Sequence, residues 1–325
     1  MENGCEAAGG LPQLLSLLRC IECGAVGQLA YLRSGVSCLQ CGHTYEVFED
    51  VLVMRRGYRL GDAVRDLRRG SPRGLAHRRR LVAAVDRWRR RRFEAARGKL
   101  DELRRRQFEH LTKSVLVKVL ARPVEVALEI GAGSFAQAAE LAKVSELVLA
   151  TEYDVAARSD GRPIAVPQHV MPICADAREL PVRDAAADLV FSSNVLEHIP
   201  NPQDALREGK RCLAKDGVMV HILPTTACRV RTALTGPLSS LLQMDPRLSG
   251  LWQRTFAVHG AVARSYWEEL RLFSVRRWRA LFRECGFTIV DEGPMIGFWS
   301  ANYDVDWAAT PLFWLGRSEH YFVVA

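Results

Sequence analysis

The 325-residue sequence predicts an α/β protein with a doubly wound, mostly parallel sheet, preceded by a small β zinc ribbon and an arginine-rich helical linker. Two observations lead to this prediction. From residue 124 onward, short apolar runs alternate with helical stretches, a rhythm typical of a parallel sheet with crossover helices. Two Cys-x-x-Cys pairs lie in the first 60 residues, a segment too small to bury much core without a staple.

The strands expected for the large sheet are short apolar runs. They lie at 124–130, 147–152, 169–175, 188–192 and 218–223, with closing strands at 287–291 and 320–324. Helices are expected at 136–143, 203–213 and 274–285. Residues 225–275 interrupt this rhythm and are rich in Leu and aromatic residues, which predicts an inserted cap.

The two cysteine pairs predict a zinc site. Cys20 and Cys23 form one pair and Cys38 and Cys41 the other, with 14 residues between the pairs, whereas the other five of the nine cysteines stand singly. In a reducing compartment such pairs indicate a metal before a disulfide, and four thiolates suit tetrahedral zinc. A site closed by four sulfurs has no open position, so the zinc should be structural. The alternative is four free structural cysteines.

β-like runs at 28–32, 35–38 and 45–54 surround these cysteines and complete the predicted ribbon. After it, helical spacing of apolar residues continues until Pro123. The sequence therefore divides into a ribbon at 1–64, an Arg-rich helical linker at 65–120 and the sheet domain at 121–325 with the cap at 225–275.

Positive charge is concentrated in the linker. Residues 65–106 hold 17 Lys or Arg against five Asp or Glu, so this segment is +12 within a chain of net charge +8. The run Arg89, Arg90, Arg91, Arg92 surrounds a helix rather than forming one stripe. It is either a solvated helix surface or a site for RNA or another polyanion, such as an anionic lipid-linked or nucleotide-linked substrate.

Two absences bear on location. No apolar stretch approaches the roughly 18 to 20 residues of a membrane span. The apolar run 11–18 is short and only acidic residues carry charge before it, which argues against a signal peptide. We therefore expect a cytoplasmic protein without a membrane span.

A nucleotide-binding pattern opens the sheet domain. Residues 127–133 read Ala-Leu-Glu-Ile-Gly-Ala-Gly, and the next apolar run ends in Thr151-Glu152-Tyr153-Asp154. A buried strand, a glycine turn and a second strand that closes on a carboxylate form the front half of a βαβ unit that binds nucleotides. In such a unit the backbone of the turn approaches the ligand and the carboxylate binds a ribose diol.

Together with the stretches at 174–177, 188–200 and 213–218, this pattern resembles the class I S-adenosylmethionine-dependent methyltransferase family over about residues 120–225. The resemblance implies a seven-stranded sheet. It places the glycine turn beside the methionine moiety, Glu152 on the ribose, Tyr153 against the adenine, Asp176 and Ala177 near the adenine amine, and Asn194 on the floor between cofactor and acceptor. The implied cofactor-binding set is Glu129, Gly131, Ala132, Gly133, Glu152, Tyr153, Asp176, Ala177 and Asn194.

One position departs from this family. Phe135 stands where the family often has a third glycine, and residue 136 is Ala, so no complete Gly-x-Gly-x-x-Gly pattern is present. This disfavours a nicotinamide dinucleotide, which stays an alternative, as does a Rossmann-like domain without catalytic activity. Residues 14–54 also resemble small zinc ribbons that activate methyltransferases or are fused to them.

The acceptor is predicted less directly. The cap and the sequence Ser-Ser-Asn-Val at 192–195, which is not the Asn/Asp-Pro-Pro-aromatic stretch of many amine methylases, favour O-methylation of a small molecule or glycan. RNA methylation is an alternative, because ribosomal RNA guanine-N1 methyltransferases share the layout but differ in ribbon spacing and ligand type. A non-catalytic zinc-ribbon scaffold is another.

A hydroxyl acceptor needs a general base. His259 and His221 are the candidates, while His198 fits a structural role better. His221 also fits a hydrogen-bonded core residue, and His259 a surface residue.

Overall fold

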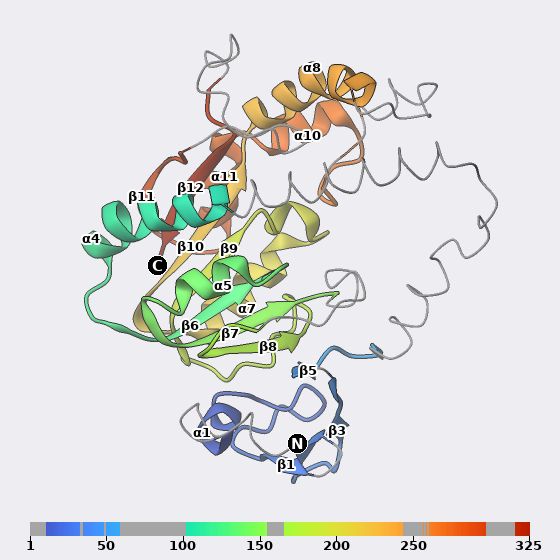
Figure 1. Ribbon diagram of the computed structural model, residues 1–325, viewed down its shortest axis with the longest axis vertical. Helices are drawn as coiled ribbons and strands as arrows, with labels where there is room; N and C mark the ends of the chain where they lie inside the picture. The colour runs from blue at the N-terminus through green and yellow to red at the C-terminus, as the bar shows by residue number, and fades with distance from the viewer. Residues whose placement is uncertain are drawn as a thin grey trace, which may run out of the picture.

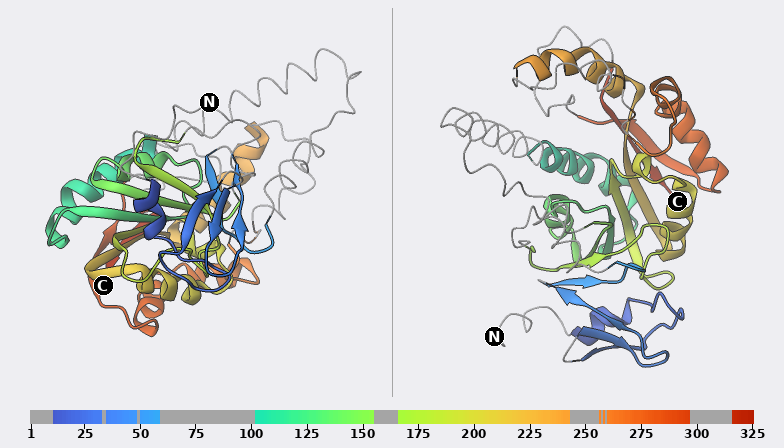
Figure 2. Two further views of the ribbon diagram at one scale, coloured as in Figure 1. Left: turned by 90° about the horizontal axis from the view of Figure 1, so that it is seen from below. Right: turned by 90° about the vertical axis from the view of Figure 1, so that its right-hand side faces the viewer.

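The computed structural model describes residues 11–32, 35–48, 50–58, 102–154, 166–242, 256, 258, 260–296 and 316–325. Within these residues the chain forms a three-stranded sheet and a nine-stranded sheet (Figure 1). The large sheet is mainly parallel and has helices on both faces (Figure 2). The predicted α/β architecture is therefore confirmed.

Five parallel strands form the centre of the large sheet. In sheet order they are β10 (Leu213–Pro224), β9 (Ala187–Ser193), β6 (Val124–Ile130), β7 (Ser145–Glu152) and β8 (Val170–Cys174). All seven residues of β9 are buried, as expected for a strand covered on both faces. Beyond β10, β12 (Glu319–Val324) and β11 (Ile289–Pro294) continue the sheet antiparallel and complete the seven expected strands.

Two strands from the ribbon segment extend the sheet at its opposite edge. β4 (Val47–Phe48) and β5 (Val51–Val53) form a hairpin, and β5 pairs in parallel with β8. The run predicted over 45–54 is thus divided, since Asp50 turns the chain with a φ of 66°. The sheet therefore has nine strands rather than the expected seven, because β4 and β5 join it. The sequence pattern indicated strands in this segment but not the strand with which they pair.

Helices cover the large sheet with two separate hydrophobic clusters. On one face lie α5 (Ala136–Leu141) and the helix 102–111, which continues through η1 (Thr112–Leu116) and α4 (Val117–Val119). On the other lie α7 (Pro202–Cys212) and α11 (Val275–Glu284). Adjacent residues of one strand, such as Ala127 and Leu128, belong to different clusters, as the period of two in a strand requires.

The ribbon consists of α1 (Leu11–Ser16) and the antiparallel strands β1 (Leu29–Leu32), β2 (Gly35–Cys38) and β3 (Thr44–Tyr45). Its buried residues belong to the same hydrophobic cluster as α7 and α11. Leu18, fully buried, forms a bridge with Val182 of the sheet domain. The boundary at residue 64 stays a prediction, and most of the linker lies outside the described residues.

The cap contains α8 (Thr226–Leu242) and α10 (Tyr266–Leu272), which lie at the top of Figure 1.

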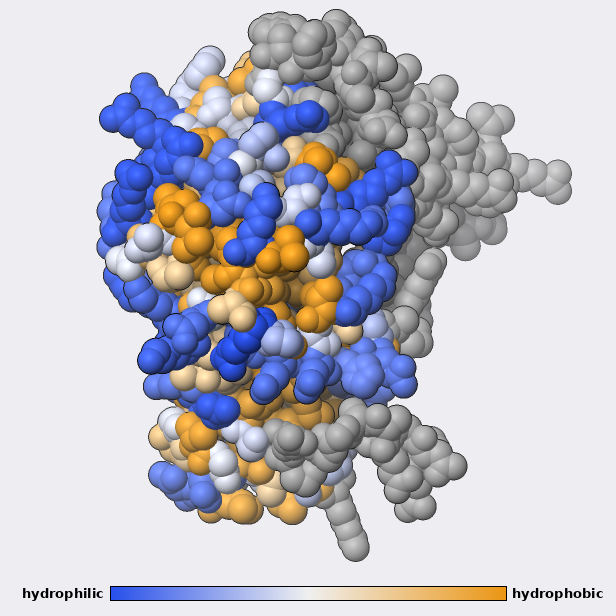
Figure 3. All heavy atoms as spheres, turned by 90° about the vertical axis from the view of Figure 1, so that its left-hand side faces the viewer, coloured by the Kyte–Doolittle hydropathy of each residue, from blue (hydrophilic) through white to orange (hydrophobic). Residues whose placement is uncertain are grey.

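Among the described residues, no helix combines the length and apolarity needed to cross a membrane. The side of the molecule that bears α4 and β11 shows apolar atoms gathered among hydrophilic side chains (Figure 3). Val117 and Val290, in these two elements, are among the exposed hydrophobic residues of the chain.

Candidate cofactor site and zinc site

The glycine turn follows β6 and is fixed to β7. The amides of Gly131 and Ala132 donate to the carbonyl of Thr151 at 2.8 and 2.9 Å. Gly131 has a φ of 74° and Gly133 a φ of 58°, backbone conformations that favour glycine. A Cβ on Gly131 would lie 2.4 Å from Cγ2 of Val195, so this position has no room for a side chain.

Glu152 at the end of β7 meets this turn. Its Oε2 accepts a hydrogen bond from the amide of Gly133 at 2.8 Å, and its Oε1 one from the amide of Asp154 at 3.3 Å. The carboxylate is largely buried, with a residue exposure of 5%. The turn and the acid, separated by 19 residues, therefore lie in direct contact at the carboxyl ends of adjacent strands.

Glu129 lies in β6 just before the turn and is 1% exposed. Among the described residues, none forms a hydrogen bond with its Oε2. Burial, with a smaller contribution from the charge of Glu152, raises the pKa of Glu129 to about 8, against the opposing charge of Arg104. A buried carboxyl group with an unused acceptor atom is suited to a hydrogen-bond donor on a ligand.

Phe135 keeps the backbone of the glycine it replaces. It begins α5 with a φ of 60°, in the left-handed region, and its amide donates to the carbonyl of Ala132 at 2.9 Å. Left-handed backbone costs a non-glycine residue about 1–2 kcal/mol. The departure in sequence thus leaves the turn in the shape that the pattern predicts.

Tyr153 and Asp176 follow β7 and β8. Tyr153 is 48% exposed. Asp176 forms an ion pair with Arg178 at 2.7 Å, and hydrogen bonds from Arg178 lower the pKa of Asp176 in spite of its partial burial. Ala177, beside them, is half-buried. The residues expected around the adenine therefore lie together at two neighbouring strand ends.

Asn194 follows β9 with a φ of 55°. Its Nδ2 donates to Oε1 of Glu319 at 2.5 Å, while its Oδ1 has no hydrogen-bond partner in the part of the chain that the structure describes. Glu319, 4% exposed, also accepts from Gln107. The sequence does not predict the roles of Gln107 and Glu319, because each is far from Asn194 along the chain and neither belongs to a motif.

Of the candidate bases, His221 lies among the described residues and His259 does not. His221 is completely buried in β10, where its Nδ1 lies 2.7 Å from Oγ of Ser192 and its ring stacks on Phe282 at 5.4 Å. Burial lowers the pKa of His221 to about 3. This environment favours the hydrogen-bonded core residue over the base. His259 lies outside the described residues, and His198, in η2 (Leu196–His198), is half exposed.

The four cysteines of the ribbon converge. The Sγ atoms of Cys20, Cys23, Cys38 and Cys41 all lie within 4.8 Å of one another and can hold a metal ion. Although burial opposes it, a hydrogen bond from the hydroxyl of Tyr45, with backbone donors, lowers the pKa of Cys20 to about 7. Four sulfurs at these distances suit a structural tetrahedral zinc. His43, which sequence analysis left out of the site, is exposed and packs on Tyr45 at 4.7 Å.

Comparison with known proteins gives the following matches. Residues 128–221 match the family described as methyltransferase domain. A chain of the complex between the Haloferax volcanii Trm112 methyltransferase activator and a proposed methyltransferase is 16% identical, with 72% of this chain and 96% of that chain covered and a TM-score of 0.46. A proposed methyltransferase from Bacillus halodurans is 17% identical, with 66% and 96% covered and a TM-score of 0.41.

No curated protein matches the chain. The family match runs from the last three residues of β6 through most of β10, so it includes the glycine turn, Glu152 and Asn194. Residues 128–221 form a methyltransferase domain, and the chain is an S-adenosylmethionine-dependent methyltransferase.

Proposed function

We propose that this chain transfers the methyl group of S-adenosylmethionine to a hydroxyl of a small-molecule or glycan acceptor by in-line displacement. The proposal depends above all on the 2.8 Å hydrogen bond from the Gly133 amide to the Glu152 carboxylate. It brings a turn open to backbone approach beside an acid able to bind a ribose diol.

The remaining cofactor residues have complementary roles. Glu129, whose Oε2 is left unbonded by the described residues, would accept a hydrogen bond from the ammonium group of the methionine moiety. The exposed ring of Tyr153 would lie against the adenine, with Asp176 and Ala177 near its amine. Gly131 and Ala132 complete the turn. When bound, S-adenosylmethionine supplies a methyl group already activated by its sulfonium.

The contacts of the cap support the proposal of a small-molecule or glycan acceptor. α8 begins at Thr226, directly after β10 ends at Pro224, so the inserted segment starts at the carboxyl edge of the sheet. A buried ion pair between Arg229 and Glu269, at 2.5 Å, joins α8 to α10. The amide of Ala261 donates to the carbonyl of Glu197 at 2.7 Å, which fixes the cap to the segment after Asn194.

An enclosed site holds the acceptor in line with the methyl group and excludes water, and this positioning supplies much of the rate enhancement. Asn194, whose Oδ1 is not bonded by any described residue, would contact the acceptor or the cofactor at the junction of the two. We keep His259 as the proposed general base, because the cap supplies it and the environment of His221 is that of a core residue.

We further propose that residues 1–64 are a zinc ribbon of the methyltransferase-activator type, joined in the same chain to the domain at 121–325 by the linker 65–120. The support is the four-cysteine cluster together with the parallel pairing of β5 on β8. This pairing makes the ribbon segment part of the large sheet.

Titration calorimetry with S-adenosylhomocysteine tests the cofactor site. Glu152→Gln should weaken binding at least about tenfold, because it removes a charged hydrogen-bond acceptor, worth roughly 1.5–3 kcal/mol. Glu146→Gln is the matched control, since Glu146 is exposed on the same strand. Equal affinity in the two variants would contradict the proposed site.

A screen with a labelled methyl donor tests the acceptor. Hydroxyl-bearing small molecules and glycans should be labelled, and structured RNA should not. Labelling of RNA that is lost when Arg89 to Arg92 are neutralised, with a steep dependence on salt, would instead establish the RNA alternative.

A further inference from the structure

The segment that leaves the ribbon contacts the end of β7, at the proposed adenine site. After β5, the amide of Met54 donates to the carbonyl of Cys174 at 2.9 Å and so continues the pairing with β8. The next residues, 55–58, form a turn in which the amide of Tyr58 donates to the carbonyl of Arg55 at 3.2 Å. This turn carries two side chains to the strand ends.

Arg55 holds Tyr153 at two points. Its guanidinium carbon lies 3.4 Å from the centre of the Tyr153 ring, and its Nη1 donates to the backbone carbonyl of Tyr153 at 2.7 Å. A guanidinium over an aromatic face is attracted by the ring quadrupole. Tyr153 is still 48% exposed, so it stays accessible to a ligand.

Tyr58 adds a second contact to the same strand end. Its hydroxyl donates to Oδ1 of Asp154 at 2.8 Å, and its ring lies 4.6 Å from the guanidinium of Arg55. The charge of Arg55 also contributes to the lowered pKa of Asp176. The turn 55–58 therefore contacts or influences residues at the ends of both strands that the adenine would approach.

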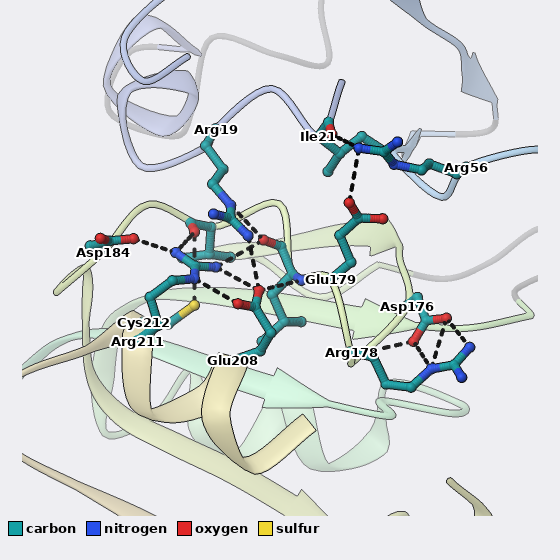
Figure 4. A network of polar contacts seen from close by, with 12 residues as sticks. Arg19, Ile21, Arg56, Asp176, Arg178, Glu179, Asp184, Glu208, Arg211 and Cys212 are labelled. Carbon is teal, nitrogen blue, oxygen red and sulfur yellow. Dashed lines mark hydrogen bonds and ion pairs between the residues drawn. The ribbon is translucent and has the colours of Figure 1, made fainter. Parts of the chain in front are cut away.

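The ribbon fixes this turn in place. Arg56 donates to the carbonyl of Ile21, which lies between Cys20 and Cys23, and forms an ion pair with Glu179 of the sheet domain at 3.0 Å. Figure 4 shows this bridge beside a second one, in which Arg19 reaches Glu208. Arg55 thus lies between the ribbon, which Arg56 contacts at Ile21, and the strand end that Arg55 itself contacts.

We propose that Arg55 is a positioning residue for the adenine of the cofactor, acting through Tyr153, so that the ribbon segment completes the cofactor site. The guanidinium covers one face of the Tyr153 ring and fixes its backbone, which leaves the ring preorganised for an adenine on the open face. This inference rests on the proposed adenine role of Tyr153.

Calorimetry with S-adenosylhomocysteine and with 5′-methylthioadenosine, which lacks the amino-acid end, tests it. Arg55→Ala should weaken both ligands by a similar factor of about five to ten, as expected for the loss of a cation–π contact and its hydrogen bond. Arg55→Lys should retain part of the affinity. Arg207→Ala, which removes only an exposed ion pair with Asp204, should bind as the wild type does.

A double-mutant cycle separates positioning from general support of the fold. In a Tyr153→Ala background, Arg55→Ala should change affinity less than twofold, since its effect passes through Tyr153. Wild-type affinity in Arg55→Ala, or an undiminished loss in the Tyr153→Ala background, would overturn the inference. If the wild-type protein itself binds neither ligand, the proposed cofactor site fails instead.

Discussion

The ribbon sheet, β1 to β3, and the nine-stranded sheet differ in the interactions that stabilise them. The ribbon strands have only four, four and two residues, and two of its four cysteines are exposed. The large sheet has a hydrophobic cluster on each face and a fully buried central strand β9. We infer that the ribbon, although its buried residues belong to one of these clusters, also depends on a metal, whereas the large sheet depends on apolar burial.

The hairpin of β4 and β5 lies between these two cases. It follows directly on the ribbon in sequence, yet its hydrogen bonds to another element go to β8 of the large sheet. Val51, Leu52 and Val53 are all buried. We therefore expect the hairpin to follow the large sheet, not the ribbon, when either region is perturbed.

The largest effect should come from loss of the metal. Cys38→Ser removes a buried thiolate, and structural zinc contributes about 10–16 kcal/mol in zinc-finger peptides at neutral pH. The variant should lose its equivalent of zinc, and the amides of β1 and β2 should lose protection from hydrogen exchange. The amides of β6 and β7 should keep theirs, because their burial does not depend on the metal.

Cys228→Ser is the matched control, since Cys228 is a buried cysteine outside the four-cysteine cluster. It should retain zinc and protection in β1 and β2. Collapse of protection in β6 and β7 in Cys38→Ser would show that the two sheets form one cooperative unit and would break the comparison.

The next largest effect should come from the hairpin. Leu52 is 3% exposed, and truncation of a buried Leu to Ala costs about 2–5 kcal/mol. Leu52→Ala should therefore lower the midpoint of urea unfolding of the large sheet while leaving zinc bound. Leu39→Ala, at a ribbon residue that is 66% exposed, should change stability by less than about 0.5 kcal/mol. A loss of zinc in Leu52→Ala would assign the hairpin to the ribbon.

The features predicted from sequence are those that depend on near neighbours in the chain. The strand predicted at 124–130 has the observed bounds, because Pro123 precedes it and the glycine turn at Gly131 follows it. The contact of Gly133 with Glu152 follows from one βαβ unit, and the four cysteines follow from two short spacings.

The features missed join residues far apart in sequence. β5 pairs with β8, Arg55 covers Tyr153, and Gln107 and Asn194 meet on Glu319. An exposed sheet edge accepts any strand of suitable pattern, so apolar alternation alone does not name the partner. No local pattern distinguishes Arg55 among the many arginines of this chain.

A smaller effect should come from the glycine turn. Gly131→Ala combines left-handed strain of about 1–2 kcal/mol with a clash against Val195, so cofactor affinity should fall more than about tenfold while zinc stays bound. Gly133→Ala has similar strain but nothing within 4 Å of the new Cβ, and should lose less.

Val195→Ala removes the atoms that the new Cβ meets and should restore part of the affinity of Gly131→Ala. Calorimetry with S-adenosylhomocysteine measures the affinity of the wild type, Gly131→Ala, Gly133→Ala and the double variant. A Gly133→Ala variant that binds more weakly than Gly131→Ala would mean that a methyl group in the open space beside Gly133, rather than the clash with Val195, limits binding at the turn.

The smallest effect should be a change in pH dependence within the large sheet. The folded-state pKa of His221 is lowered to about 3 by burial, whereas an unfolded His titrates near 6.5. Below pH 6.5 the unfolded chain binds a proton that the native chain does not. The free energy of unfolding therefore decreases as the pH is lowered toward 3, by up to about 1.4 kcal/mol per pH unit.

His221→Asn, which does not titrate there, should unfold in urea with a shallower loss of stability between pH 7 and pH 5.5. Zinc release on acidification should affect both proteins equally, so the difference in slope reports His221. Equal slopes for His221→Asn and the wild type would mean that the native state protonates this histidine, and hence that the core around β9 and β10 opens more readily than its burial indicates.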